Sequence, residues 1–171
     1  IYNVQDVVTE KMVEDADVVE GARAIGFTLG LPGLSMIGVV EDFIVDRAFL
    51  EERQTHAQEL CAVDDIQPNA PHNIANALAA AALARSYGVE AAHVRDGLRS
   101  FVPAPHRIAT VGQFNGVTYI DDSKATNCHA AQMSLKAYEN VIWIAGGQAK
   151  GQDFAELIKQ NSKNIKAAVL L

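Results

Sequence analysis

Seven residues in the second half of the chain combine groups that suit the binding of an anion. The sequence DDSKATN fills positions 121–127, directly after an apolar run that is typical of a strand. Lys124 supplies an ammonium group and Thr126 a hydroxyl, and the first turn of a following helix would add unpaired N–H groups with a partial positive charge. A carboxylate fits this combination, and Asp121 or Asp122 could accept hydrogen bonds from a ribose or an ammonium group. The spacing is equally compatible with a plain helix cap by Asp122 or the serine after it, with Lys124 in solvent.

A second loop places a lysine in a similar setting. IAGGQAKGQDF, residues 144–154, is an apolar strand followed by glycines and Lys150. Glycine lets a backbone approach a ligand closely, but this pattern is neither GxGxxG nor a Walker A loop and alone is typical of a simple strand-to-helix turn. If the strands before the two loops are parallel, their carboxyl ends share one edge of a sheet. Lys124 and Lys150 would then lie at the same site.

Two asparagines open an alanine-rich stretch. In PHNIAN, residues 71–76, Asn73 and Asn76 are three positions apart and share one face of a helix. A carboxamide offers paired donors and acceptors, which suits the edge of an adenine. Capping of the helix by Asn69 or Asn73 is the alternative, and spacing alone favours it slightly.

The elements of the first hundred residues follow from periodicity and turn residues. Pro71 suits the first turn of a helix, Gly88 suits its C-terminal end, and the alanines between them are strong helix formers. We expect a helix over 4–16, a strand over 22–30, a hairpin over 36–50, a helix-to-loop transition over 57–66, and helices over 71–87 and 90–101, the last burying Ala92, Val94, Leu98 and Phe101.

The stretch VPAP, residues 102–105, is the best linker because two prolines stop the preceding helix. Arg107 follows it, where a cation could reach a ligand, although a lone arginine is usually a surface residue. Beyond the linker we expect two strands around the turn Asn115–Gly116, then helices and strands in alternation: strands 109–114 and 116–120, helix 125–138, strand 140–147, helix 154–160 and strand 166–171. This order predicts an α/β fold with a parallel sheet.

Composition excludes several classes of protein. Hydrophobic residues make up 49% of the chain and charged residues 20%, with a net charge of −7, so nucleic acid and anionic membrane are not expected partners. No apolar run approaches the length of a bilayer span. The two cysteines, Cys61 and Cys128, lie far apart and favour a reducing cytoplasm. No HxH or HExxH arrangement is present, so no metal site is predicted.

Four stretches in this order resemble the Mur ligases of peptidoglycan synthesis: APHNIANALAAAALAR, FVPAPHRIATV, GVTYIDDSKATN and IAGGQAKGQDF. They cover about residues 70–155. DDSKATN is the most specific, and its lysine–threonine pair points to the branch that adds D-glutamate. The resemblance implies that residues 1–104 are the C-terminal portion of a central ATP-binding domain. Residues 105–171 would then be the N-terminal portion of a Rossmann-like amino-acid-binding domain.

The resemblance also implies an activity. The intact protein would be a monomeric, cytoplasmic, ATP- and Mg²⁺-dependent ligase that adds D-glutamate to UDP-N-acetylmuramoyl-L-alanine through an acyl phosphate. Another Mur-type or folylpolyglutamate-type ligase, or a non-catalytic nucleotide- or amino-acid-binding module, remains an alternative.

By resemblance, the candidate residues divide between the two ligands. The nucleotide side takes His72, Asn73 and Asn76 near the adenine, Arg107 at the ATP phosphates and Asp122 at the ribose. Lys124 and Thr126 would hold D-glutamate, and Lys150 would be the catalytic residue that supports the negatively charged intermediate.

The chain departs from the family pattern in two ways. Cys128 stands where the family often has proline, with a modest expected effect on the helix start. More seriously, the chain contains no GxxxxGK[ST] loop, no upstream metal-binding motif and no modified lysine. Both ends read as interrupted strands. We therefore expect a fragment that is inactive alone, with the metal ligands outside it.

Overall fold

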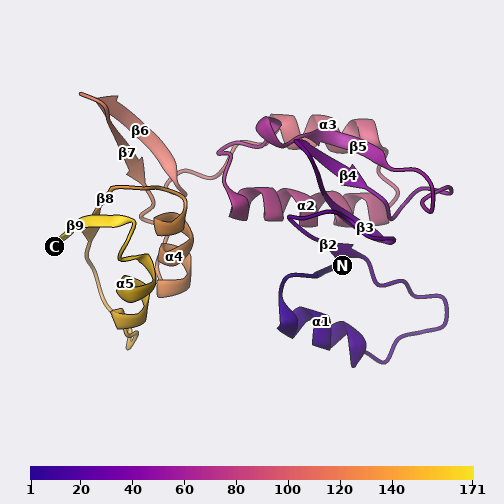
Figure 1. Cartoon of the computed structure of the whole chain (residues 1–171), viewed down its shortest axis with the longest axis horizontal. Helices are drawn as coiled ribbons and strands as arrows, with labels where there is room; N and C mark the ends of the chain where they lie inside the picture. Colours follow the sequence, from indigo (N-terminus) through magenta and orange to yellow (C-terminus); the bar gives the residue numbers. More distant parts are fainter. The chain divides into compact units, whose positions relative to one another are not determined.

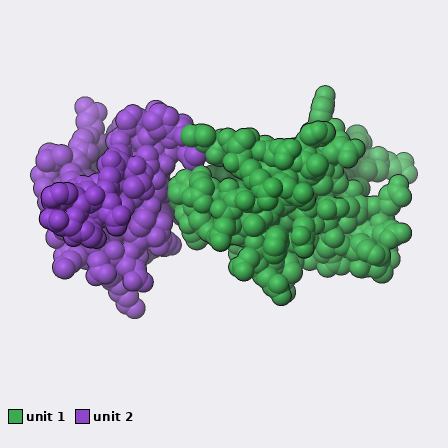
Figure 2. Space-filling view, turned by 90° about the horizontal axis from the view of Figure 1, so that it is seen from above, with its two compact units in different colours: residues 1–102 green, residues 103–171 purple.

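The computed structural model describes the whole chain, residues 1–171, and Figure 1 shows its ribbon. The chain divides into two compact units, residues 1–102 and residues 103–171 (Figure 2). The division falls inside the two-proline stretch 102–105, where the fixed φ of proline prevents continuation of the preceding helix. Each unit has a hydrophobic core of its own. No helix in either unit has the length and apolar character needed to cross a membrane.

Unit 1 is built on a five-stranded mixed sheet in the order β1-β2-β3-β4-β5. The first three strands pair in parallel, and β3, β4 and β5 pair antiparallel. The strands are β1 (Tyr2–Asn3), β2 (Gly26–Phe27), β3 (Met36–Val40), β4 (Phe43–Asp46) and β5 (Gln58–Ala62).

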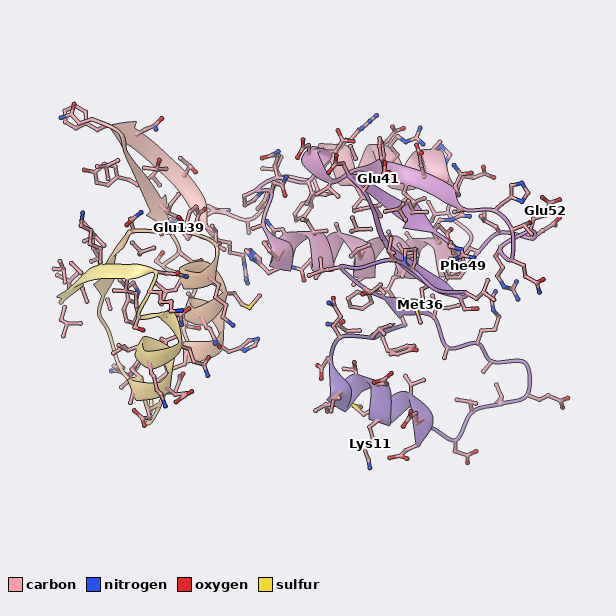
Figure 3. The ribbon with its side chains drawn as sticks, in the orientation of Figure 1. Lys11, Met36, Glu41, Phe49, Glu52 and Glu139 are labelled. Atoms are coloured by element: carbon pink, nitrogen blue, oxygen red, sulfur yellow. The ribbon has the colours of Figure 1, made fainter.

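The sheet confirms one strand prediction and corrects two. The expected hairpin over 36–50 is present as β3 and β4, with Glu41, labelled in Figure 3, at the turn. The expected strand over 22–30 is regular only in the two residues of β2. The helix-to-loop interpretation of 57–66 is wrong, because these residues form β5 and a 3-10 turn, η1 (Val63–Asp65). Glutamine, glutamate, leucine and alanine favour helix in isolation, and pairing with β4 overrides that preference.

The alanine-rich helix is present where it was predicted, and it packs against the sheet. α2 (Pro71–Ser86) begins with Pro71 in its first turn, and the chain leaves it at Gly88, whose φ of +89° suits a residue without Cβ. Its small side chains allow close packing on the strands, where Ala77, Leu78, Ala81 and Ala82 are buried.

The two other helices of unit 1 bury less. α3 (Ala91–Ser100) contributes Val94 to the core and packs Leu98 partly against it, whereas Ala92 and Phe101 are exposed, so the prediction was wrong for those two. α1 (Val7–Glu14) has no buried residue, and Figure 3 shows Lys11 extending away from the sheet.

A buried ion pair joins the sheet of unit 1 to α2. Asp46 at the end of β4 is fully buried and accepts hydrogen bonds from Ala48 N (2.7 Å) and Phe49 N (3.0 Å). Its other oxygen accepts from Arg85 Nε at 2.9 Å, and Arg85 Nη1 donates to the carbonyl of Val89 at 2.8 Å. The pair therefore ties the strand end, the end of α2 and the turn after it into one polar network within an apolar core.

Unit 2 contains two separate two-stranded sheets and two helices. β6 (Ala109–Phe114) and β7 (Val117–Asp121) form the antiparallel hairpin that was predicted, with φ of +48° at Asn115 and +77° at Gly116, as a type I′ turn requires. α4 (Cys128–Lys136), β8 (Val141–Ala145), α5 (Ala155–Asn161) and β9 (Ile165–Leu170) follow, and β8 and β9 are parallel. The fold is thus mixed α/β, as predicted.

The parallel sheet is smaller than the order of elements indicated. β7 is hydrogen-bonded to β6 alone and does not join β8 and β9. The short type I′ turn satisfies one edge of β7 locally, so the strand needs no parallel neighbour there. The argument that Lys124 and Lys150 share a sheet edge therefore fails, and α4 also starts at Cys128, later than the predicted residue 125.

Candidate functional site

In unit 2, the segment after the linker lies directly against the DDSKATN loop. His106 donates from Nδ1 to Asp121 Oδ2 at 2.6 Å. Lys124 N donates to the carbonyl of His106 at 3.1 Å, and Ile108 N donates to Asp122 Oδ1 at 3.1 Å. Three hydrogen bonds therefore hold residues 106–108 on residues 121–124.

Arg107 sits between two residues with left-handed backbone. φ is +68° at His106 and +49° at Ile108, a conformation that is costly for a β-branched side chain. Burial of Ile108, which is 6% exposed, and the hydrogen bonds on either side maintain it. The backbone at Arg107 is consequently fixed from both sides, while its guanidinium is exposed and makes no hydrogen bond or ion pair within the chain.

The two aspartates of the loop have different partners. Asp121 Oδ1 accepts from Ser123 N at 3.0 Å, in addition to the contact of Oδ2 with His106. Asp122 reaches inward: besides the bond from Ile108 N, it accepts a short hydrogen bond from Ser134 Oγ on α4. Both oxygens of Asp122 thus already have a partner in unit 2, and a ribose would use their remaining lone pairs.

The charge of Asp122 is also felt by Tyr138. Burial of the phenol raises the pKa of Tyr138, and the nearby Asp122 carboxylate raises it further. Through its hydrogen bonds with Ser134 and Ile108, Asp122 contacts α4 as well as the segment that carries Arg107.

The cap of α4 differs from both predicted candidates. Asn127 Oδ1 accepts from Ala130 N at 2.8 Å and is the N-cap, whereas Asp122 begins a separate turn in which Ala125 N donates to its carbonyl at 2.8 Å. Asp122 and Ser123 do not cap the helix. Lys124 and Thr126 consequently lie in an exposed irregular loop between β7 and α4, with neither side chain hydrogen-bonded within the chain.

The glycine loop after β8 reaches the start of α4 by a side-chain contact. Gln152 Oε1 accepts from Cys128 N at 2.7 Å, and Cys128 Sγ donates to the carbonyl of Asp153 at 3.6 Å. Lys150 (φ +49°) and Gly151 (φ +73°) are the central residues of a type I′ turn closed by Gln152 N and the Ala149 carbonyl, 2.9 Å apart. The loops that carry Lys124 and Lys150 are therefore neighbours for a reason other than the predicted one.

The two loops and the linker segment carry three exposed basic side chains, one of which is close in sequence to the carboxylates of Asp121 and Asp122. Arg107, Lys124 and Lys150 are all exposed, and none of them forms an ion pair within the chain. In a chain with a net charge of −7, cations left without acidic partners on adjoining loops favour an anionic ligand.

In unit 1, the asparagines at the start of α2 behave differently from one another. Asn73 Nδ2 donates to the carbonyl of Pro68 at 3.0 Å and so holds the preceding loop. Asn76, one turn further on, is exposed and makes no side-chain hydrogen bond within the chain. The N-cap is Ala70, and Asn69 Nδ2 donates to Asp64 Oδ1 at 2.7 Å, so capping by Asn69 or Asn73 was wrong. His72 is partly buried in the same turn.

Sequence reasoning missed the contacts that four side chains make at the candidate site: His106, Asp121 as its acceptor, Ser134 and Gln152. One signal for the first pair was present. In the predicted hairpin, Ala109 pairs with Asp121, so the residues just before Ala109 must lie beside those just after Asp121. Extending the register by three residues would have placed His106 near the loop. The contacts of Ser134 and Gln152 span 12 and 24 positions and have no comparable signal.

No group of three or more His, Cys, Asp or Glu side chains in the chain could hold a metal ion. Both cysteines are free thiols, with Cys61 buried.

The low pKa of Asp121 leads us to expect that the stability of unit 2 depends on this carboxylate only in strong acid. The Ser123 N–H, followed by His106, lowers its pKa from 3.8 to about 2. Because the folded-state pKa is the lower one, the charge stabilises unit 2 fully above pH 3.8, and this contribution is lost as the pH falls through 2. We expect the Asp121 carboxyl carbon to titrate near pH 2 by NMR, and Asp121→Asn to weaken the acid dependence of unit 2 in that window. A midpoint near 3.8 would contradict these hydrogen bonds.

Comparison with known proteins places these features in context. No protein-family model matches the chain. The UDP-N-acetylmuramoylalanine--D-glutamate ligase of Streptomyces coelicolor is 62% identical over 171 residues, which are all of this chain and 36% of that protein. The protein of the same name from Streptomyces avermitilis is 61% identical over the same length, and that from Thermobifida fusca is 55% identical over 150 residues. The chain spans about a third of the length of these relatives. It is therefore similar over its whole length to part of the UDP-N-acetylmuramoylalanine--D-glutamate ligases, which confirms the resemblance to the Mur ligases that its motifs indicated.

Proposed function

We propose that this chain supplies nucleotide- and amino-acid-binding parts of an ATP-dependent ligase that joins D-glutamate to UDP-N-acetylmuramoyl-L-alanine in peptidoglycan synthesis. The observation that carries the proposal is the 62% identity, over the entire chain, with a relative whose name states D-glutamate ligation. The exposed, unpaired cations on adjoining loops of unit 2 support it, because both substrates that these loops would meet are anionic.

We assign the two parts of the chain to two domains of the intact protein. Residues 1–104 would be the C-terminal portion of the central ATP-binding domain, and residues 105–171 the N-terminal portion of the amino-acid-binding domain. In the first part, Asn76 has a free carboxamide for the adenine, and Asn73 would use the carboxamide oxygen that its bond to Pro68 leaves available. His72 would lie beside them.

In the second part, each polar side chain would have a distinct partner. Arg107 would contact the ATP phosphates, since its backbone is fixed and its guanidinium is free to bind an anion. Asp122 would accept from the ribose, and Lys124 and Thr126 would hold the D-glutamate carboxylates.

The reaction would pass through an acyl phosphate. The substrate carboxylate oxygen takes the γ-phosphoryl group of ATP and ADP leaves. The D-glutamate amine then attacks the acyl carbon, forming the C–N bond, and the C–O bond to phosphate breaks as the amine loses a proton. Lys150 would be the catalytic residue that stabilises the negative charge of the tetrahedral intermediate. Mg²⁺ would accompany ATP, held by ligands outside these residues. The intact protein would work as a monomer in the cytoplasm.

The direct test is ATP-dependent phosphate release by the intact protein with UDP-N-acetylmuramoyl-L-alanine. D-glutamate, L-glutamate, L-lysine and meso-diaminopimelate are supplied in turn. Turnover with D-glutamate alone is the expected result. Turnover with another amino acid would identify a different Mur-type ligase, and no turnover with any of them would favour a non-catalytic binding module. The 171 residues alone are expected to be inactive.

Asn76 provides the cleaner probe of the nucleotide assignment. Asn73→Ala would also release the loop at Pro68, whereas Asn76→Ala removes only an exposed carboxamide. We expect Asn76→Ala to raise the KM for ATP about three- to tenfold, the loss of one net hydrogen bond, with the KM for D-glutamate unchanged. Ser86→Ala, at the other end of α2, is the control. A change in the KM for D-glutamate instead would reverse the assignment.

A further inference from the structure

We propose that Asp121 is a positioning residue that acts through His106 to hold Arg107 and Lys124 in the arrangement that binds an anionic substrate. The identity of the anionic substrates, ATP and D-glutamate, rests on the proposed function. The linkage from Asp121 through His106 to the two cations rests on the hydrogen bonds of unit 2.

The linkage converges on a single residue. The ring of His106 donates to Asp121 at 2.6 Å, and its carbonyl accepts from Lys124 N at 3.1 Å. Arg107 is the next residue in the chain. His106 therefore links the backbone at both cations, which come from segments 17 positions apart in sequence, and its ring contact with Asp121 anchors that link.

The backbone at His106 needs such a contact. A φ of +68° is uncommon for a residue with a Cβ and persists only where surrounding interactions maintain it. The His106 ring is 54% exposed, so packing does not hold it, and its one ring contact is with Asp121. Without Asp121 the segment would lose the only side-chain contact of His106, one of the three hydrogen bonds that hold residues 106–108, and the backbone at His106 and Arg107 would be less restrained.

The charges around the contact support this direction of action. Asp121 stays ionised throughout the physiological range because the Ser123 N–H and His106 hold its pKa at about 2. Its neighbours are the carboxylate of Asp122, which is bound to Ile108 and Ser134, and the cations Arg107 and Lys124. Asp121 forms no ion pair with either cation, so both side chains stay available to a ligand.

A double-mutant cycle tests the linkage in the intact protein. Asp121→Ala is expected to raise the KM for ATP about tenfold, with a smaller effect on kcat, and to have no further effect when Arg107→Ala is already present. Asp121→Asn keeps an oxygen that can accept from His106 and is expected to restore most of the affinity. Gln113→Ala, an exposed polar truncation on the same hairpin, is the control and should change neither constant.

Additive effects of the two alanine substitutions would overturn the proposal, as would an unchanged KM in Asp121→Ala. Binding of inorganic pyrophosphate to the 171-residue chain, followed by NMR, separates this outcome from failure of the proposed function. The wild-type protein could lack ligase turnover while the 171-residue chain still binds pyrophosphate. In that case the affinities of Asp121→Ala, Arg107→Ala and the double variant for pyrophosphate must be non-additive if the linkage is correct. Absence of both turnover and pyrophosphate binding would overturn both proposals.

Discussion

Replacing Asp46 with alanine is expected to lower the free energy of unfolding of unit 1 by about 3–5 kcal/mol, because it leaves the Arg85 guanidinium uncompensated in the core. The loss also removes the acceptor for the N–H groups of Ala48 and Phe49. The side chain of Arg85 is only 13% exposed, so water cannot readily take the place of the carboxylate. This is among the largest effects that a single substitution produces.

The single tryptophan of the chain makes this prediction sharp. Trp143 lies in β8 of unit 2, so its fluorescence reports that unit, whereas far-UV circular dichroism reports both. In urea, Asp46→Ala should shift the circular dichroism transition of unit 1 and leave the Trp143 transition in place. Asp96→Ala, an exposed aspartate on α3 without a hydrogen-bond partner, is the matched control. A loss of under about 1 kcal/mol, typical of a surface ion pair, would contradict the buried network.

Lys124→Ala in the intact protein is expected to raise the KM for D-glutamate by about 10- to 150-fold, equivalent to roughly 1.5–3 kcal/mol for a hydrogen bond to a charged group. The side chain has no partner within the chain, and the bond of Lys124 to His106 uses the backbone N–H, which alanine retains. The substitution therefore removes the ammonium group without releasing the loop. Initial-rate kinetics at saturating ATP would measure the change.

Lys136→Ala is the control for charge alone, because it removes an exposed lysine at the far end of α4. It should leave the KM for D-glutamate within about twofold of the wild-type value, since exposed charges at a distance are screened by salt. Equal effects of the two substitutions would show that net charge controls D-glutamate binding. An unchanged KM in Lys124→Ala would remove Lys124 from the site.

Local physics was enough to predict much of this chain. The Asn115–Gly116 turn requires two residues at positive φ, so the β6–β7 hairpin followed from sequence. Pro71 and Gly88 marked α2 because one lacks an N–H and the other a Cβ. The residue types of DDSKATN led to the prediction of an anion site, which stays a prediction, and the order of four motifs indicated the resemblance that the 62% identity with a Streptomyces coelicolor protein supports.

Long-range pairing decided the rest. β5 became a strand because β4 offered an unsatisfied edge, and β7 stayed out of the parallel sheet because β6 already occupied one of its edges. Neither pairing can be predicted from the local sequence, because the residues of a strand do not determine which strand it pairs with.

The candidate site shows the same division. Its residue types were evident in the sequence by itself: Arg107, Lys124, Thr126 and Lys150 carry groups whose chemistry does not depend on the fold. What only the tertiary structure decided is which of their neighbours hold them. The contact of His106 with Asp121 spans 15 positions and that of Gln152 with Cys128 spans 24. Such contacts form only after the chain has closed the intervening loops, and the entropy of that closure is recovered through packing of the whole unit.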